Sequence, residues 1–552
     1  MKNFVFSLIL STFATVGIAQ TGWKNTLSDS LTQKLCFIES YSDGNFYSLT
    51  FDYSQSGQNF LLSKIDSGGF TIGQISFTLG TNVPKIKSFS IDTVQQKLVV
   101  ISQSEDVSNY EMRMTTFDYS LIANDSLLFM LSKTNIDSLN VAGGGLDNFG
   151  DKFIIYTSRD INDQIWSRAI CKKNASGTIK TNTVKVGQAS NDGFYINDCI
   201  VTPTGSIYIG GSRKESLYGN YFYFEKLNAS MATIFEVKEQ LVTFNTENNH
   251  VSSIHVYTTT SASHVVVGGT IFGLAPGDTV NRCHGIIRSY TYNGVLRWNY
   301  ENLEVRDYKK VIGKNSYVHA IGTNNVGTTG LDTKITRLFI KDGVVDWNRY
   351  FGSKSTPNSL IIEKDGSLLI GGDKLVTIPK PGGGNLSART YMLIRYSKYG
   401  KKLYDFNNAW TIPSATSFVS GMTTDIACGK NGQYFIAGYN RMIYNNGVGN
   451  TVADSISFFQ FTNGALRYEL PAKSDIELTI RPNPATSEIT FDCNFQILDM
   501  MVINSTGAKT PIEELSQDGS SYHCNISMLS PGIYILKVRT EKGWEAKPFI
   551  KK

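Results

Sequence analysis

A segment of about 55 residues recurs through most of this 552-residue chain, and the repeat limits the folds that the chain can adopt. Each copy contains an apolar strand that ends in a pair of glycines or in a close variant of that pair. Copies begin at Asn45, Lys97, Lys152, Ser206, His264, Tyr317, Ser367 and Gln433. Because one four-stranded sheet cannot bury both of its faces, several copies must pack against one another.

Turn signals divide each copy into four strands. Asn293-Gly294 and Asp342-Gly343 are typical of tight hairpins, since both central residues can take positive φ. An aromatic residue follows four positions after such a glycine, as Trp298 follows Gly294 and Trp347 follows Gly343. In the fifth copy these signals predict strands at 251–258, 264–270, 284–292 and 295–301.

Four-stranded meanders around a common axis form a β-propeller. Separate β-sandwich domains are the alternative, but each would need about 100 residues. We therefore predict an all-β fold with an eight-bladed propeller over residues 20–471, or a seven-bladed one, because the first three copies lack the glycine pair. Ring closure requires residues near 33–80 to lie beside residues near 417–471. Residues 22–27 resemble an outermost strand that would pair with the last blade.

The segments Ile207-Tyr-Ile-Gly-Gly211 and Phe224-Glu-Lys-Leu-Asn228, with the Gly-x-x-x-Trp hairpins, resemble SBBP-type β-propeller repeats of secreted bacterial proteins. The resemblance covers about 440 residues and implies a propeller. It does not imply a particular function, since propellers serve many.

The first 19 residues resemble a secretory signal peptide. Lys2 precedes an apolar stretch from Phe4 to Ile18, and Gly17 and Ala19 supply the small residues of a cleavage site before Gln20. The stretch is shorter than the about 20 residues that a membrane-spanning helix needs. No later stretch is long and apolar enough, so we expect no transmembrane segment.

Residues 476–552 break the repeat, after a linker at 472–475. Ile489, Phe491 and Cys493 alternate with polar residues, as in a half-buried strand. Turns follow at intervals, and about 75 residues with short strands suit a small Ig-like β-sandwich.

This segment resembles the type A C-terminal sorting domain of type IX secretion substrates. The residues that carry the resemblance are Pro482, Asn483, Pro484, Asn504, Gly507, Leu529, Gly532, Ile533, Tyr534 and the basic end Lys551-Lys552. The resemblance implies that the type IX translocon and its sorting machinery are partners of the chain. It also implies that the protein is released outside the cell or attached to the outer-membrane surface.

Seven cysteines are scattered along the chain without metal-binding spacing. Cys493 and Cys524 fall on the inward faces of two strands that we expect to be antiparallel neighbours. A disulfide between them is allowed in an exported protein. It would close a loop of about 30 residues and stabilise the fold by about 3 kcal/mol. The alternative is that both are packed core residues.

The sequence gives no sign of a catalytic residue, a metal site or a cofactor. Its six histidines include His250, His255 and His264, but strand alternation places the last two on different faces or at different ends. The net charge of +5 is spread thinly, which argues against a nucleic-acid partner.

The connections between second and third strands lengthen along the chain. They are expected as loops at 270–283, 323–331, 373–388 and 439–453. Such loops emerge on one face of a propeller, where binding sites gather. Candidate binding residues in them are Phe272, Arg282, Lys374, Tyr439, Arg441 and Tyr444. We therefore predict a protein that binds an extracellular glycan or protein without catalysis; the alternative is an extracellular hydrolase or lyase with its active site at the propeller mouth.

Overall fold

The computed structural model divides the chain into two compact units, Met1–Arg467 and Tyr468–Lys552. The expected signal peptide at 1–19 and linker at 472–475 lie outside the residues that the structure describes. The described residues are 24–26, 33–40, 45–52, 59–66, 71–78, 85–185, 192–215, 219–240, 249–258, 263–274, 281–324, 332–351, 354–379, 385–408, 417–428, 434–445, 450–461, 478–504, 509–510, 515–518, 521–540 and 543–552.

Eight four-stranded antiparallel sheets form the described part of the first unit. The first four are β2 (Gln33–Ser40), β3 (Phe46–Asp52), β4 (Asn59–Ile65), β5 (Thr71–Thr78); β6 (Lys85–Asp92), β7 (Lys97–Glu105), β8 (Asn109–Asp118), β9 (Ala123–Ser132); β10 (Ile136–Leu146), β11 (Lys152–Asp160), β12 (Trp166–Lys173), β13 (Ile179–Lys185); and β14 (Gly193–Val201), β15 (Ile207–Glu215), β16 (Gly219–Leu227), β17 (Thr233–Glu239).

The next three sheets are β18 (His250–Thr258), β19 (Ser263–Gly273), β20 (Arg282–Thr291), β21 (Leu296–Asn302); β22 (Asp307–Lys314), β23 (Tyr317–Asn324), β24 (Asp332–Phe339), β25 (Val345–Phe351); and β26 (Ser355–Ile362), β27 (Leu368–Pro379), β28 (Asn385–Tyr396), β29 (Lys402–Asn408). The eighth combines β30 (Ser417–Cys428), β31 (Tyr434–Asn445) and β32 (Asn450–Phe461) with the N-terminal β1 (Lys24–Thr26).

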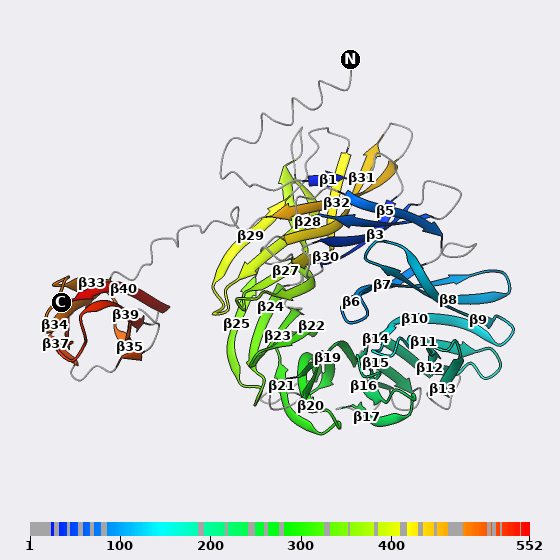
Figure 1. Cartoon of the computed structure of the whole chain (residues 1–552), viewed down its shortest axis with the longest axis horizontal. Helices are drawn as coiled ribbons and strands as arrows, with labels where there is room; N and C mark the ends of the chain where they lie inside the picture. The colour runs from blue at the N-terminus through cyan, green and yellow to red at the C-terminus, as the bar shows by residue number, and fades with distance from the viewer. Residues whose placement is uncertain are drawn as a thin grey trace, which may run out of the picture. The chain divides into compact units, whose positions relative to one another are not determined.

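The sheets follow one another around a ring, which gives the first unit a propeller-like fold (Figure 1). Each sheet contacts the next through its first strand, and β2 of the first sheet contacts β30, β31 and β32 of the last. The predicted contact between the two ends of the repeat region is therefore confirmed. The predicted closing strand is also confirmed, because β1 pairs antiparallel with β32, Asn25 opposite Phe458.

The glycine pair marks the place where consecutive sheets approach most closely. In the fourth sheet, the first strand has a β-bulge between Ile196 and Asp198, directly opposite Gly211 and Gly210. A Cβ atom on Gly211 would overlap the carbonyl oxygen of Tyr195, and one on Gly210 would lie 2.6 Å from Val251 of the next sheet. Only glycine leaves room for both approaches.

The same arrangement recurs in other sheets. The fifth sheet has its bulge opposite Gly268 and Gly269, and the seventh opposite Gly371 and Gly372. Bulge residues also reach the next sheet: Asp198 Oδ2 accepts a hydrogen bond from the Ile254 amide at 2.7 Å. The repeated glycines therefore serve the contact between sheets as well as the local strand geometry.

The turn glycines and the aromatic residues that follow them form a second contact between sheets. Gly343 and Gly400 take φ of +73° and +77°, as the hairpin prediction requires. A Cβ on Gly343 would lie 2.7 Å from the indole of Trp298 in the preceding sheet. Trp298 Nε1 donates to the Ile340 carbonyl of the same turn at 2.8 Å. Trp347 contacts the turn of Gly400 in the same way, with Nε1 3.3 Å from the Lys398 carbonyl oxygen.

Replacing Gly211 by alanine tests the close approach of the bulged strand β14 to β15 within the fourth sheet. We expect Gly211→Ala to lower the free energy of unfolding of the full chain by about 2–4 kcal/mol, because the new methyl group must displace main chain. Gly73→Ala is the matched control, since the nearest atoms to its Cβ would lie at 3.5 and 3.7 Å. Equal denaturation curves for the two variants would contradict this account.

The second unit consists of two four-stranded antiparallel sheets around one hydrophobic cluster. The predicted inward face of Ile489, Phe491 and Cys493 is confirmed, since these side chains are buried and alternate with less buried ones. The sheets are β33 (Leu478–Arg481), β34 (Glu488–Cys493), β38 (Ser521–Asn525), β37 (Leu515–Asp518); and β36 (Lys509–Thr510), β35 (Ile497–Asn504), β39 (Gly532–Thr540), β40 (Gly543–Lys551).

The strand order explains why the disulfide prediction is wrong. β34 and β38 are antiparallel neighbours, as expected, but Cys524 lies opposite Ile489 rather than at the level of Cys493. The offset of four positions between Ile489 and Cys493 separates the two cysteines by about 13 Å along the strands, beyond the about 7 Å limit for Cα atoms in a disulfide. Both are free and buried, so they are packed core residues.

Candidate functional site

The six candidate binding residues lie within strands, so the expectation that they occupy loops is wrong. Phe272 and Arg282 are near the paired ends of β19 and β20, where Gly273 lies opposite Arg282. Lys374 lies in β27. Tyr439, Arg441 and Tyr444 lie in β31. Their hairpins continue as paired strands beyond the predicted limits. Phe272 pairs with Cys283 and not with Arg282, so Phe272 and Arg282 point to opposite faces of one sheet, and the other four lie on two different sheets.

The region of His250, His255 and His264 offers no activated nucleophile. Asp307 of β22 accepts a hydrogen bond from Ser252 Oγ at 2.7 Å, and its other oxygen lies 3.4 Å from His250 Nε2. The carboxylate thus separates the serine from the imidazole, whereas a nucleophile must contact its base. Among the described residues, no group of three or more His, Cys, Asp or Glu side chains gathers as metal ligands would.

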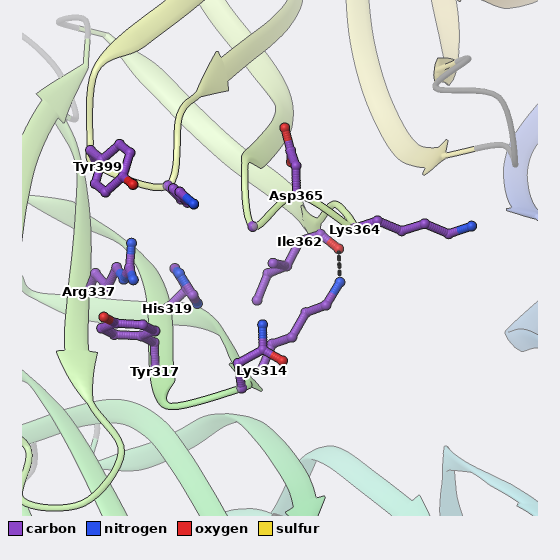
Figure 2. Close-up of a pocket in the computed structure, with 11 residues that line it drawn as sticks. Lys314, Tyr317, His319, Arg337, Ile362, Lys364, Asp365 and Tyr399 are labelled. Carbon is purple, nitrogen blue, oxygen red and sulfur yellow. Dashed lines mark hydrogen bonds between the residues drawn. The ribbon is translucent and has the colours of Figure 1, made fainter. Parts of the chain in front are cut away.

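A cavity of about 320 Å³ opens between the sixth and seventh sheets (Figure 2). Three tight turns form its rim: the β22–β23 turn with Asn315, the β26–β27 turn with Asp365, and the β28–β29 turn with Tyr399. In an antiparallel meander these turns lie at the opposite end of the sheet from the connection between second and third strands. The cavity is therefore on the other face of the ring from the one that the sequence favoured.

Cationic and aromatic side chains dominate the lining. The residues are Lys314, Asn315, Tyr317, His319, Arg337, Ile362, Lys364, Asp365, Gly366, Lys398 and Tyr399. Four lysine or arginine side chains thus face a single carboxylate. Tyr399 is 71% exposed at the mouth, whereas the ring of Tyr317 is covered by the Arg337 guanidinium, 3.4 Å from the ring centroid.

Some of these charges are already engaged within the protein. Lys314 donates to the carbonyl oxygens of Ile362 and Glu363 at 2.8 Å each. The Arg337 guanidinium pairs with Asp346 at 3.2 Å. By contrast, Lys364 and Lys398 are exposed, and neither ammonium group has a carboxylate partner among the described residues. These two lysines are therefore available to an anionic ligand.

His319 is the most unusual group in the cavity. It is only 3% exposed, and neither ring nitrogen has a hydrogen-bond partner. Burial and the positive charge of Arg337 lower the pKa of its imidazole to about 3, and the nearby main chain of Ile312 opposes this shift without meeting hydrogen-bond geometry. His319 is therefore neutral at ordinary pH, with one nitrogen able to donate and the other to accept.

The sequence contained a signal for this site. Each glycine-pair strand has a third residue that is apolar or a tyrosine in the clearest copies, namely Tyr208, Val266 and Leu369. His319 occupies that position in the copy beginning at Tyr317. A histidine at a position that is apolar or tyrosine in the clearest copies is the sequence feature that indicates this site.

The predicted sorting residues fold against the last strand of the second unit. Asn483 Oδ1 accepts a hydrogen bond from the Ile550 amide at 2.9 Å, which ties the Pro482–Pro484 segment to the end of β40. Tyr534 stacks on Phe549 of β40 with a centroid distance of 5.8 Å. Gly532 is exposed opposite Lys551, and Gly507 lies outside the described residues.

Residues 479–552 match the family of secretion system C-terminal sorting domains. The chain carries a type IX sorting tail. The protein is therefore secreted, and it is either attached to the cell surface or released from it. Along the described part of the chain, we find no helix with the length and apolar character needed to cross a bilayer.

Similar solved structures do not extend this conclusion. The chain is 9% identical to quinohemoprotein alcohol dehydrogenase from Comamonas testosteroni, with a TM-score of 0.44 over 85% of this chain and 79% of that one. It is 8% identical to Sqt1 from Chaetomium thermophilum, with a TM-score of 0.42 over 79% of this chain and 100% of that one. Likenesses this weak carry no argument about function. No curated protein sequence matches the chain.

The buried neutral state of His319 predicts a pH-dependent stability. The unfolded chain binds a proton at this residue below about pH 6.5, whereas the folded chain does so only near pH 3. Stability is therefore lost as the pH falls through this window, by about 1.4 kcal/mol per pH unit. Between pH 7 and 4.5, we expect the free energy of unfolding of the unmodified chain to fall by about 2–3 kcal/mol more than that of the His319→Gln variant. Denaturant unfolding at the two pH values measures this difference. Parallel losses would show that the imidazole is protonated or hydrated in the folded protein.

Proposed function

We propose that this protein is a secreted or cell-surface eight-bladed β-propeller that binds an extracellular glycan without catalysis. The eight sheets are its blades, with the propeller over residues 20–471 and an Ig-like sorting domain over 476–552. A signal peptide at 1–19 delivers the chain to the periplasm, and the type IX translocon reads the tail. The closed contact between first and last sheets and the pairing of β1 with β32 support the blade count.

The cavity between the sixth and seventh sheets is the observation that carries the binding proposal. Its volume of about 320 Å³ is at the lower end of the range for small-molecule sites. An exposed aromatic ring at the mouth, Tyr399, provides a face on which a sugar ring can pack. The buried His319 and the free lysines supply the few directed polar contacts that fix a ligand's orientation.

A hydrolase or lyase is less well supported by the same lining. Its only carboxylate, Asp365, accepts hydrogen bonds from the Ser367 amide and hydroxyl at 2.8 and 2.9 Å. Glycoside hydrolysis uses two carboxyl groups facing the scissile bond. The described lining contains no such pair.

A glycan array probed with the full chain tests the proposal. We expect bound glycans whose affinity falls about tenfold or more in Tyr399→Ala, because an exposed aromatic anchor contributes more than about 1 kcal/mol to recognition. Tyr195→Ala is the control, since Tyr195 is 51% exposed on the fourth sheet, outside the cavity. Turnover of any bound glycan would overturn the non-catalytic part, and equal binding by the two variants would overturn the assignment to this cavity.

The tail makes a separate prediction about delivery. Deletion of residues 476–552 should leave the first unit folded but retained in the periplasm, because each unit has its own hydrophobic clusters. Immunoblotting of cell fractions, with limited proteolysis of the periplasmic protein, measures both results. Residues 468–552 fused to a periplasmic carrier protein should in turn be exported. Surface delivery of the truncated chain would reject the role given to the tail.

A further inference from the structure

The gap between the fourth and fifth sheets is equivalent to the gap that contains the cavity, but side chains of the protein fill it. Tyr292, from the β20–β21 turn, reaches back to the fourth sheet, where its hydroxyl lies 2.9 Å from Ser206 Oγ. The Lys226 ammonium lies 2.7 Å from the centroid of the Tyr292 ring and also donates to its carbonyl oxygen at 3.1 Å. The same ammonium lies 5.5 Å from the centroid of the Tyr208 ring. The protein's own side chains thus occupy the space.

The cavity lies at the equivalent position two sheets further along the ring. Tyr208 is paired with Lys226 in the fourth sheet, and His319 is paired with Arg337 in the sixth. Tyr292 stands two residues before its turn glycine, and Lys398 stands two residues before Gly400. The aromatic plug is therefore replaced by a lysine, and the tyrosine behind it by a histidine.

These replacements turn a filled gap into an open one with unmet polar groups. Both nitrogens of His319 lack partners although the side chain is 97% buried. Leaving such a group unpaired raises the free energy of the folded protein, and hydrogen bonds from a ligand would offset this cost. The ligand must offer an acceptor for one nitrogen and a donor for the other, because a neutral imidazole has one of each.

Resting on the proposed function, we propose that this cavity binds an acidic sugar, a pyranose that carries a carboxylate. Its hydroxyl groups can both donate to and accept from His319. Its carboxylate would pair with the ammonium group of Lys398 at the rim, whereas the Lys364 side chain extends away from Tyr399 and His319 (Figure 2). Its ring would pack against Tyr399, as Figure 2 shows this side chain across the opening from Arg337 and His319.

Other ligand classes meet fewer of these demands. A phenol, as on a tyrosine side chain of a protein partner, has the shape of the plug between the fourth and fifth sheets but brings no negative charge for Lys398 at ordinary pH. A simple carboxylate pairs with the lysine but has no hydroxyl to donate to the accepting nitrogen of His319. Hydrogen phosphate has a hydroxyl and a charge but no ring face to pack against Tyr399. The acidic sugar satisfies both sets of groups at once.

Calorimetry with a tetrasaccharide of galacturonic acid and its methyl ester tests the proposal, since the ester removes only the charge. We expect the full chain to bind the acid at least tenfold more tightly than the ester. Lys398→Ala should abolish this preference while leaving binding of the ester unchanged, and because Lys398 is exposed, the variant should fold normally. His319→Phe, which keeps a ring but removes both nitrogens, should weaken both probes at least tenfold, and His319→Gln should recover part of the loss.

His264→Phe is the control, because His264 is a buried histidine in the neighbouring fifth sheet, outside the cavity; its binding should match that of the unmodified chain. Equal affinity for acid and ester, with both weakened in Tyr399→Ala, would overturn the acidic sugar and keep the glycan site. If the chain binds neither probe but still binds neutral array glycans through Tyr399, the acidic sugar is likewise overturned and the glycan site is kept. Absence of binding to every glycan would overturn the proposed function itself.

Discussion

The ring depends on how closely one sheet can approach the next near its first strand. At Gly210 and Gly211 the fourth sheet has no side chains, so Val251 of the fifth sheet and the bulged strand in front both come within contact distance. The bulge then turns Asp198 toward the following sheet, where it accepts the Ile254 amide. In the fourth sheet, a Cβ on Gly210 would displace the fifth sheet, and a Cβ on Gly211 would displace the bulged strand. The glycine pair therefore serves packing in the sheets that have it, whereas the second and third sheets have Ile101-Ser102 and Ile155-Tyr156 opposite their bulges.

The outer strands carry a second repeated contact, and it explains how a site can arise on this fold. Trp298 and Trp347 each bind the turn of the following sheet, so these two turns are held at the same place beside the preceding sheet. Residues next to the turn glycine therefore always point at the same gap. Tyr292 fills one gap, and Lys398 leaves the equivalent gap open. Different residues at equivalent positions therefore fill one gap and line a cavity in another, which is why the fold alone does not indicate function.

The sequence predicted the repeat, the positive-φ turns, the closing strand and the sorting tail, because each rests on local patterns of glycine and alternating residues. It failed where long-range register decides the outcome. Cys493 and Cys524 occupy the expected strands, but the pairing of Ile489 with Cys524 separates them. Lys374 lies in a strand and not in the expected loop, because β27 and β28 remain paired as far as Pro379 opposite Asn385. The cavity could not be predicted because its residues come from strands and turns of two separate sheets, which only the packing of the sheets brings together.

His319 shows why a buried polar group in a repeat is informative. Its position in the other clear copies holds Tyr208, Val266 or Leu369; the two aliphatic side chains have no polar atom, and Tyr208 leaves one hydroxyl unpaired where His319 leaves two ring nitrogens. The histidine instead leaves two polar atoms unpaired and lowers stability at acidic pH, so it is a worse choice for the fold. The same strand keeps Gly322, the glycine that lets it approach its bulged neighbour, so the packing frame is retained. A costly residue within an otherwise intact frame is what a binding site requires, because the ligand supplies the hydrogen bonds that the protein leaves out.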